Sequence, residues 1–141
     1  MADARYIEFK LDDVSKARLR ALTEKLFGDA YSRVYCDHVT LAYGPEQVAA
    51  YDKSLLGASG EFSAWKVISD EKGAALELDR EDLSRLGVNN KRPHVTLACA
   101  DGTKPVYSNA LIEGYYSGRF AAEATCLDEP CVVSGVVRAV F

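Results

Sequence analysis

An internal repeat is the feature that most constrains how this chain can fold. The pentapeptide His-Val-Thr-Leu-Ala occurs at residues 38–42 and again at 94–98 of a chain of 141 residues. The segments ahead of the two copies also correspond, because residues 6–15 (YIEFKLDDVS) parallel residues 75–84 (ALELDREDLS). A chance repeat of this kind is improbable in so short a chain. We therefore infer an internal duplication, with most of the first helix missing from the second half.

Apolar spacing and turn residues predict the same order of elements in both halves: a strand, a helix or turn, a repeat strand, a helix and a hairpin. Gly28 ends the first predicted helix, and Pro45 suits the first position of the second. The predicted strands are 3–11, 34–43, 61–69, 74–79, 94–100, 118–126 and 131–140. The predicted helices are 13–27, 45–56 and 105–113.

Two halves of the same content, joined without a linker, predict a single α+β domain over residues 1–141. We expect a bilobal, pseudo-two-fold arrangement in which two antiparallel sheets face each other across a central cleft, with the helices on the outside. Under this symmetry the two repeat strands are equivalent central strands. Their polar side chains would therefore point into one shared space.

Alternation along a strand places every second residue on the same face. His38 and Thr40 therefore share one face of the first repeat strand. His94 and Thr96 share the corresponding face of the second, and the Val and Leu residues between them face an apolar layer. Two imidazoles and two hydroxyls are expected to converge on one cleft.

This set of groups suits in-line displacement at phosphorus. One neutral imidazole takes a proton from the attacking oxygen, and the opposite imidazolium gives a proton to the leaving oxygen. The hydroxyls of Thr40 and Thr96 can hydrogen-bond the non-bridging phosphate oxygens. A single histidine on an apolar strand is usually a packing residue. Here, however, the only two histidines in the chain, His38 and His94, are the two that the repeat preserves.

A metal site is the alternative for these histidines. Cys36 is expected on the same strand face as His38 and, with His94, could complete a small ligand set. Matched carboxylate or cysteine partners are too few, so we expect no metal and no cofactor. Four cysteines are also too few and too irregular for a disulfide scaffold, although Cys126 and Cys131 flank an expected hairpin turn at residues 127–130. We expect reduced thiols.

Net charge and hydropathy limit the binding partners and the cellular location that we expect. A net charge of −4 argues against a protein that grips a long nucleic-acid duplex, and it favours a mononucleotide or a strand end. No apolar run approaches the roughly 18 residues that a membrane-spanning helix needs. Charged residues are spread through the first 13 positions, where a signal peptide would need an apolar run. We expect a cytoplasmic monomer without membrane contact.

The paired H-x-T-x motifs, His38-Val39-Thr40-Leu41 and His94-Val95-Thr96-Leu97, resemble those of the 2H phosphoesterase superfamily. The resemblance covers the whole chain in length, duplication and motif spacing. It implies that His38 and His94 are catalytic and that Thr40 and Thr96 bind phosphate. The implied enzyme is a metal-independent phosphodiesterase that hydrolyses 2′,3′-cyclic phosphates of nucleotides or RNA ends. RNA-end members often carry a basic residue after the second motif, where this chain has Ala98-Cys99, which argues against a long RNA substrate.

Three further residues are candidates for the cleft mouth. Tyr43 offers a face on which a base can stack, and Lys91 and Arg92 offer positive charge. The alternatives are a packing aromatic for Tyr43 and a solvated loop for the two cations. Two other functions also fit the motifs: hydrolysis of cyclic or 2′-5′ oligonucleotide messengers, and a nucleotide-binding module without turnover.

Overall fold

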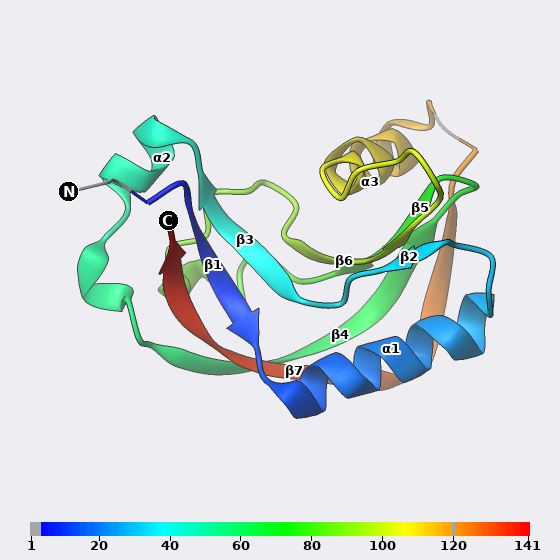
Figure 1. Cartoon of the computed structure of the whole chain (residues 1–141), viewed down its shortest axis with the longest axis horizontal. Coiled ribbons are helices and arrows are strands. Elements are labelled where there is room, and N and C mark those ends of the chain that lie inside the picture. The colour runs from blue at the N-terminus through cyan, green and yellow to red at the C-terminus, as the bar shows by residue number, and fades with distance from the viewer. Residues whose placement is uncertain (1–3, 120) are drawn as a thin grey trace.

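The computed structural model describes residues 4–119 and 121–141, so residues 3 and 120, at the start of one predicted strand and inside another, lie outside it. The described residues form an α+β fold (Figure 1). Its strands are β1 (Tyr6–Leu11), β2 (Arg33–Val34), β3 (His38–Tyr43), β4 (Ser59–Ser69), β5 (Gly73–Glu77), β6 (His94–Cys99) and β7 (Glu123–Val140). Its helices are α1 (Asp13–Phe27), α2 (Pro45–Ala50) and α3 (Tyr107–Ser117).

The strands form one continuous antiparallel sheet. Their order is β6-β3-β1-β7-β4-β5, and β5 pairs back with β6, so six strands close into a barrel, with the short β2 added beside β6. The predicted pair of separate sheets is therefore not what the described residues form. The reason is pairing between the halves: Val39 of β3 pairs with Val95 of β6, and the long β7 pairs with both β1 and β4. Because the barrel is closed, each of the six strands has a paired neighbour on both sides.

The alternation predicted for the repeat strands explains how they sit in the barrel. Val39, Leu41, Val95 and Leu97 are fully buried and belong to the main core. The intervening histidines and threonines therefore point to the outer face of the sheet. In Figure 1, β3 and β6 run across the middle of the molecule, with α2 on one side of them and α3 on the other.

Helices α1 and α3 pack apolar side chains against the sheet. α1 packs Leu19 and Leu22 against the main core, while Leu111 and Ile112 of α3 form a second cluster with β-strand residues. Asp12 caps α1 by accepting the Ser15 N–H. α2 begins at Pro45 as predicted but ends at Ala50, because the chain turns into a 3₁₀ turn at Lys53–Leu55.

The C-terminal region differs from the predicted hairpin. Residues 123–140 form one strand, β7, rather than two strands around a turn. Ala64 pairs with Cys131 and Lys66 pairs with Cys126, so residues 127–130 stand opposite Trp65 as a bulge. Both flanks of the bulge keep the same direction along β4, which a hairpin turn would reverse. Cys126 and Cys131 are free thiols on a single strand. Within the described ranges, no helix has the length and apolar character needed to cross a membrane.

Candidate active site

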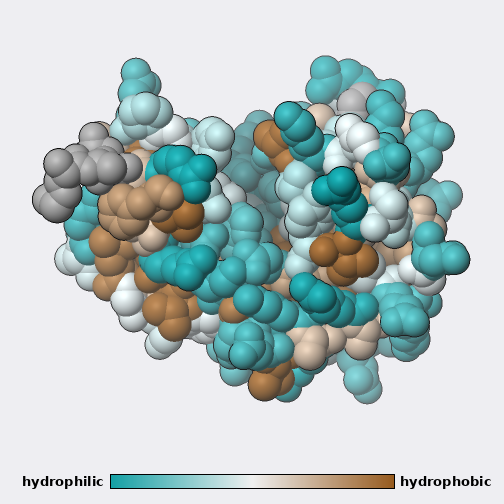
Figure 2. All heavy atoms as spheres, in the orientation of Figure 1, coloured by the Kyte–Doolittle hydropathy of each residue, from teal (hydrophilic) through white to brown (hydrophobic). Residues whose placement is uncertain are grey.

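A cavity of about 910 Å³ lies over the outer face of β3 and β6. Figure 2 shows the corresponding hollow between two raised parts of the surface. The four predicted catalytic and phosphate-binding residues, His38, Thr40, His94 and Thr96, all line it. Because Val39 pairs with Val95, the two motifs lie side by side as neighbouring strands. They form the floor of the cavity and do not face each other from opposite sheets.

The three candidates for the cavity mouth behave differently. Tyr43 is 69% exposed and Lys91 is also exposed, and both line the cavity. Arg92 does not line it: its guanidinium packs 4.0 Å above the Tyr116 ring, and its Nε donates to Glu113 at 3.2 Å. Only the backbone carbonyl of Arg92 reaches the site. Nor is Arg92 a solvated loop residue, the alternative considered above, because its side chain packs on α3.

His94 is buried, and its Nδ1 is hydrogen-bonded to the backbone. Its Nδ1 lies 2.9 Å from the carbonyl oxygen of Arg92. A carbonyl only accepts, so Nδ1 carries the proton and Nε2 keeps its lone pair in the neutral ring. Burial lowers the pKa of His94; the bond to the Arg92 carbonyl acts in the opposite direction, and the nearby His38 lowers the pKa further. His94 is therefore neutral at physiological pH and can accept a proton.

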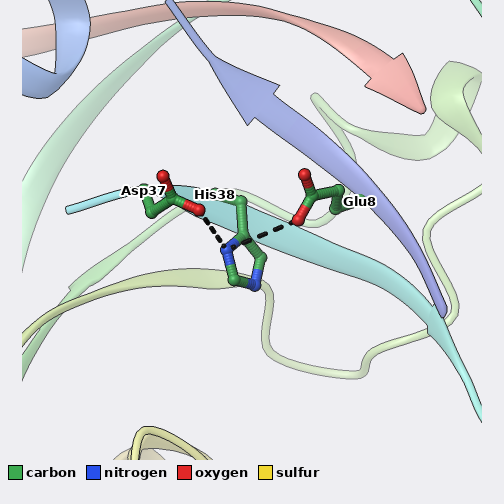
Figure 3. A group of neighbouring side chains, drawn as sticks. All are labelled: Glu8, Asp37 and His38. Atoms are coloured by element: carbon green, nitrogen blue, oxygen red, sulfur yellow. Dashed lines mark hydrogen bonds and ion pairs between the residues drawn. The ribbon is translucent and has the colours of Figure 1, made fainter. Parts of the chain in front are cut away.

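His38 is partly exposed and contacts acidic groups. Its Nδ1 lies 3.1 Å from Oδ2 of Asp37 and 3.6 Å from Oε1 of Glu8 (Figure 3). Carboxylates accept hydrogen bonds, so Nδ1 again carries the proton and Nε2 is left for the cavity. The ring also stacks on Tyr6 with centroids 5.9 Å apart. The two histidines thus share a tautomer but differ in the charge beside Nδ1.

An irregularity in the backbone brings Asp37 to His38. Neighbours on a regular strand point to opposite faces, but Cys36 has a φ of 52°, in the left-handed region. The Cys36 N–H donates to the Thr96 carbonyl, whereas Val39 pairs with Val95, so Asp37 and His38 form a bulge without partners on β6. The same bulge turns Cys36 into the core.

The prediction that Cys36 shares a face with His38 is therefore wrong. The Cys36 Sγ is fully buried, where it lies 3.4 Å from the Leu97 carbonyl and 3.6 Å from the Thr23 hydroxyl. The left-handed Cys36 breaks the strand alternation on which that prediction depended. The alternative metal site of His38, His94 and Cys36 loses its thiol.

The threonines occupy unequal surroundings. The Thr96 hydroxyl lies 2.8 Å from the Ser108 hydroxyl and donates to the Pro105 carbonyl at 3.3 Å, at the start of α3. Thr40 pairs across the sheet with Glu8 of β1. Ser108 is buried, and nothing in the sequence distinguishes it from other serines as a partner of the second motif.

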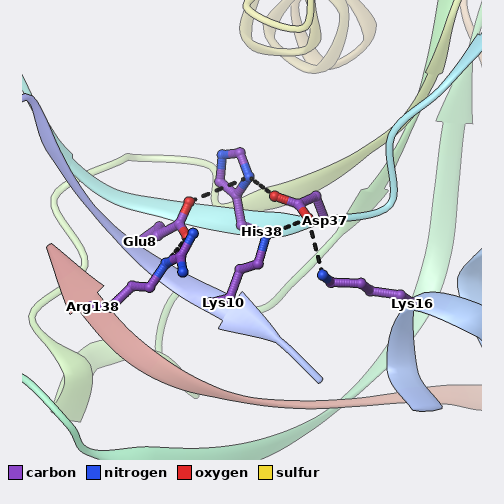
Figure 4. Close-up of polar contacts among 6 residues, drawn as sticks. All are labelled: Glu8, Lys10, Lys16, Asp37, His38 and Arg138. Carbon is purple, nitrogen blue, oxygen red and sulfur yellow. Dashed lines mark hydrogen bonds and ion pairs between the residues drawn. The ribbon is translucent and has the colours of Figure 1, made fainter. Parts of the chain in front are cut away.

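Sequence reasoning also missed the charged network beneath His38, shown in Figure 4. Arg138 of β7 donates through Nε to Oε2 of Glu8 at 2.7 Å. Lys10 donates to Oδ1 of Asp37, and Lys16 lies 3.3 Å from the same oxygen. The strand pairing that joins Glu8 to Arg138 spans almost the whole chain and leaves no local signal.

Glu8, Asp37 and His38 could in principle hold a metal, since each offers a ligand atom and these atoms lie within 4.8 Å of one another. Both carboxylates, however, already contact cations: Glu8 contacts Arg138, and Asp37 contacts two lysines. Such positive neighbours oppose a divalent ion. This donor set fits a salt-bridge network, and we assign no metal to it.

Comparison of the chain with protein-family models and with curated proteins finds no match. The candidate site is therefore defined by its geometry: two imidazoles and two threonine hydroxyls line one cavity of the size that small ligands occupy.

Proposed function

We propose that this protein is a metal-independent phosphodiesterase that hydrolyses 2′,3′-cyclic phosphates of nucleotides or RNA ends, as the resemblance to 2H phosphoesterases implies. One observation supports this most: both histidines line the same cavity and both hold Nδ1 in a hydrogen bond. Each ring is thereby oriented with Nε2 available for proton transfer. The proposed setting is the cytoplasm, with a monomeric enzyme and no long duplex as substrate.

The reaction assigns opposite roles to the histidines. His94, which is neutral, takes a proton from a water molecule as that water attacks phosphorus. The bond from phosphorus to the 2′ or 3′ oxygen breaks, and His38 gives the leaving oxygen its proton. The carboxylates beside Nδ1 hold the ring with Nε2 directed into the cavity, where the leaving oxygen would lie, and this suits the acid role. Thr40 and Thr96 donate hydrogen bonds to the non-bridging phosphate oxygens. For this, the Thr96 hydroxyl gives up its long hydrogen bond to the Pro105 carbonyl.

Aromatic and basic groups at the mouth suit a nucleotide. The rings of Tyr6 and Tyr43 stack with centroids 6.1 Å apart, and the outer face of Tyr43 is exposed to a base. Lys91 adds one positive charge to the cavity lining. A few local donors are enough to bind a small anion, even on a protein of negative net charge.

A pseudo-two-fold duplication belongs to the same proposal. In the barrel, β1 lies between β3 and β7, and β5 lies between β6 and β4. These two sets of three strands match the repeats in the sequence, in which β1 corresponds to β5 and β3 to β6. We propose that the two sets derive from one ancestral unit whose copies closed on each other.

Hydrolysis of 2′,3′-cyclic nucleotides in EDTA, with products separated by chromatography, tests the proposal. Each of His38→Ala and His94→Ala should lose about 10²–10⁴-fold in rate, because each removes one general acid or base. Lys25→Ala, at the far end of α1, is the control and should keep the wild-type rate. Full activity in either histidine variant would show that the acid/base assignment is wrong.

A second candidate is hydrolysis of a cyclic or 2′-5′ oligonucleotide. It is favoured by the extent of the cavity, which continues from Tyr43 past the histidines to Val34 of β2 and Val106 beside α3. Both valines are exposed, so a second base would find apolar surface there. A panel of such oligonucleotides distinguishes the candidates, and tight nucleotide binding without any turnover would instead favour a binding module.

A further inference from the structure

We propose that Glu8, held by Arg138, is a positioning residue for His38, and that Asp37 supports it from the other side of the ring. This inference rests on the proposed function. Glu8 and Asp37, the carboxylate pair, both face Nδ1 of His38. They act through His38 and touch no reacting atom.

Glu8 is the stronger member of the carboxylate pair because of its burial. It is 1% exposed, and a carboxylate so buried needs a partner for each oxygen. Oε2 accepts from Nε of Arg138 at 2.7 Å, and Oε1 lies 3.6 Å from Nδ1 of His38. Water has little access to take the place of Glu8 beside the ring.

Asp37 contributes from the bulge at the start of β3. Its Oδ2 lies 3.1 Å from Nδ1, and its Oδ1 contacts Lys10 and Lys16. Partial burial favours the neutral acid, but hydrogen bonds from Lys10 and His38 outweigh it and lower the pKa of Asp37 to about 2. Asp37 is half-exposed, so water can substitute for part of its effect. The charged or titratable groups around His38 are Tyr6, Glu8, Lys10, Lys16, Asp37, His94 and Arg138.

The repeat provides an internal comparison for Glu8. In the matching segments YIEFKL and ALELDR, Glu8 corresponds to Glu77. Glu8 pairs across the sheet with Arg138, and Glu77 pairs with Lys66. Glu77, however, accepts from the Tyr116 hydroxyl at 2.6 Å, while Nδ1 of His94 bonds to a neutral carbonyl. Only the first half therefore places its glutamate against its histidine.

The chemical consequence is a difference between the two rings. A carboxylate beside Nδ1 fixes the tautomer, orients Nε2 and stabilises the imidazolium, as it does for other carboxylate-supported histidines. A carbonyl fixes the tautomer but adds no full negative charge. Glu8 thus sets the direction and the surrounding charge of the ring that gives its proton to the leaving oxygen.

The test is Glu8→Gln, which keeps the shape and removes the charge. We expect kcat to fall about 10–100-fold, with KM within about twofold, because substrate contacts are unchanged. The alkaline limb of the pH–rate profile should move to lower pH, since a less stabilised imidazolium loses its proton earlier. Glu77→Gln, at the equivalent position of the repeat, should leave kcat and the profile unchanged. Wild-type kcat and profile in Glu8→Gln would overturn the inference.

A double variant guards against a folding defect. Glu8→Gln leaves Arg138 without its partner, so Glu8→Gln/Arg138→Met removes both charges together. It should fold and show the same shift of the alkaline limb. Its control is Glu77→Gln/Lys66→Met, which changes the corresponding pair of the other half. A wild-type profile in a folded Glu8→Gln/Arg138→Met variant would contradict the positioning role.

A measurement without turnover separates this inference from the proposed function. Nitrogen NMR of the imidazole rings should show a proton on Nδ1 of His38 in the wild type, and a smaller imidazolium fraction in Glu8→Gln at the same pH. An unchanged His38 signal would overturn the inference. Absence of turnover on every phosphodiester would instead refute the proposed function alone. If EDTA abolishes turnover, and Mn²⁺ or Zn²⁺ restores it in the wild type but not in Glu8→Gln, the carboxylate pair binds metal and its positioning role is refuted.

Discussion

At the scale of single residues, burial separates two histidines that the repeat makes identical in sequence. His94 lies deep in the floor of the cavity, and burial is the largest cause of its lowered pKa. His38 lies nearer the solvent and beside carboxylates. Identical pentapeptides therefore carry two chemically distinct imidazoles, because each ring takes its properties from residues outside the motif.

The lowered pKa of His94 predicts a pH-dependent stability. Below the ordinary value of 6.5, the unfolded chain protonates this histidine while the folded chain resists protonation. The unfolded state then binds more protons, so the free energy of unfolding falls as the pH drops. Relative to His94→Gln, the wild type should lose stability between about pH 7.5 and 5.5, by at most about 1.4 kcal/mol per pH unit. Urea unfolding of both proteins across this range measures the difference, which would be constant if His94 titrated alike in both states.

The limits of sequence-based prediction are clearest for particular residues. Strand alternation correctly placed His38 and Thr40 opposite the core-facing valine and leucine, and it did the same for the second motif. It failed at Cys36, because only the folded backbone reveals a positive φ there. Glu8 reads as an ordinary polar strand residue, and its burial follows from long-range pairing with β7. The single barrel was not predicted either, because the strand pairings that close it are also long-range.

At the scale of elements, α3 is attached to the sheet by the turn between β4 and β5. The Asp70 side chain accepts the N–H groups of Lys72 and Gly73 at 2.8 and 3.0 Å, and the Tyr107 hydroxyl of α3 donates to its other oxygen. The next residue of α3, Ser108, contacts Thr96 in the cavity. The predicted turn at this hairpin therefore also sets the position of a helix beside the second motif.

We expect Asp70→Ala to lower the free energy of unfolding by about 2–3 kcal/mol, because it removes the acceptor of three hydrogen bonds. Asp70→Asn keeps the side-chain oxygen that serves the turn and should lose about 1 kcal/mol. Urea unfolding provides both values. If the two substitutions had equal effects, the turn hydrogen bonds would not be the source of the stability.

At the scale of the whole molecule, closure of the barrel depends on a close approach between β1 and β7. Gly135 pairs with Leu11, and a Cβ added at Gly135 would lie 2.1 Å from the Lys10 carbonyl oxygen. Backbone cannot yield to such a contact as a flexible side chain can. Glycine is therefore required at position 135, where β1 and β7 pair beside Lys10.

Gly135→Ala should consequently destabilise the protein by about 3 kcal/mol or more, because strands must separate to admit the methyl group. Val136→Ala is a suitable control on the same strand, since Val136 is half-exposed, and it should cost less than about 1 kcal/mol. Thermal and urea unfolding measure both. A stable Gly135→Ala protein would show that the β1–β7 contact is looser than described.

The pairing of Val39 with Val95 has a practical consequence. Each half of the chain supplies one imidazole, and the exposed segment around Arg80 and Glu81 lies between them. A chain cut there would yield two fragments, neither of which holds a complete acid/base pair. The proposed hydrolysis would return only when the two fragments reassociate and rebuild the barrel, so a pair of such fragments would act as a split reporter with no background signal from either one.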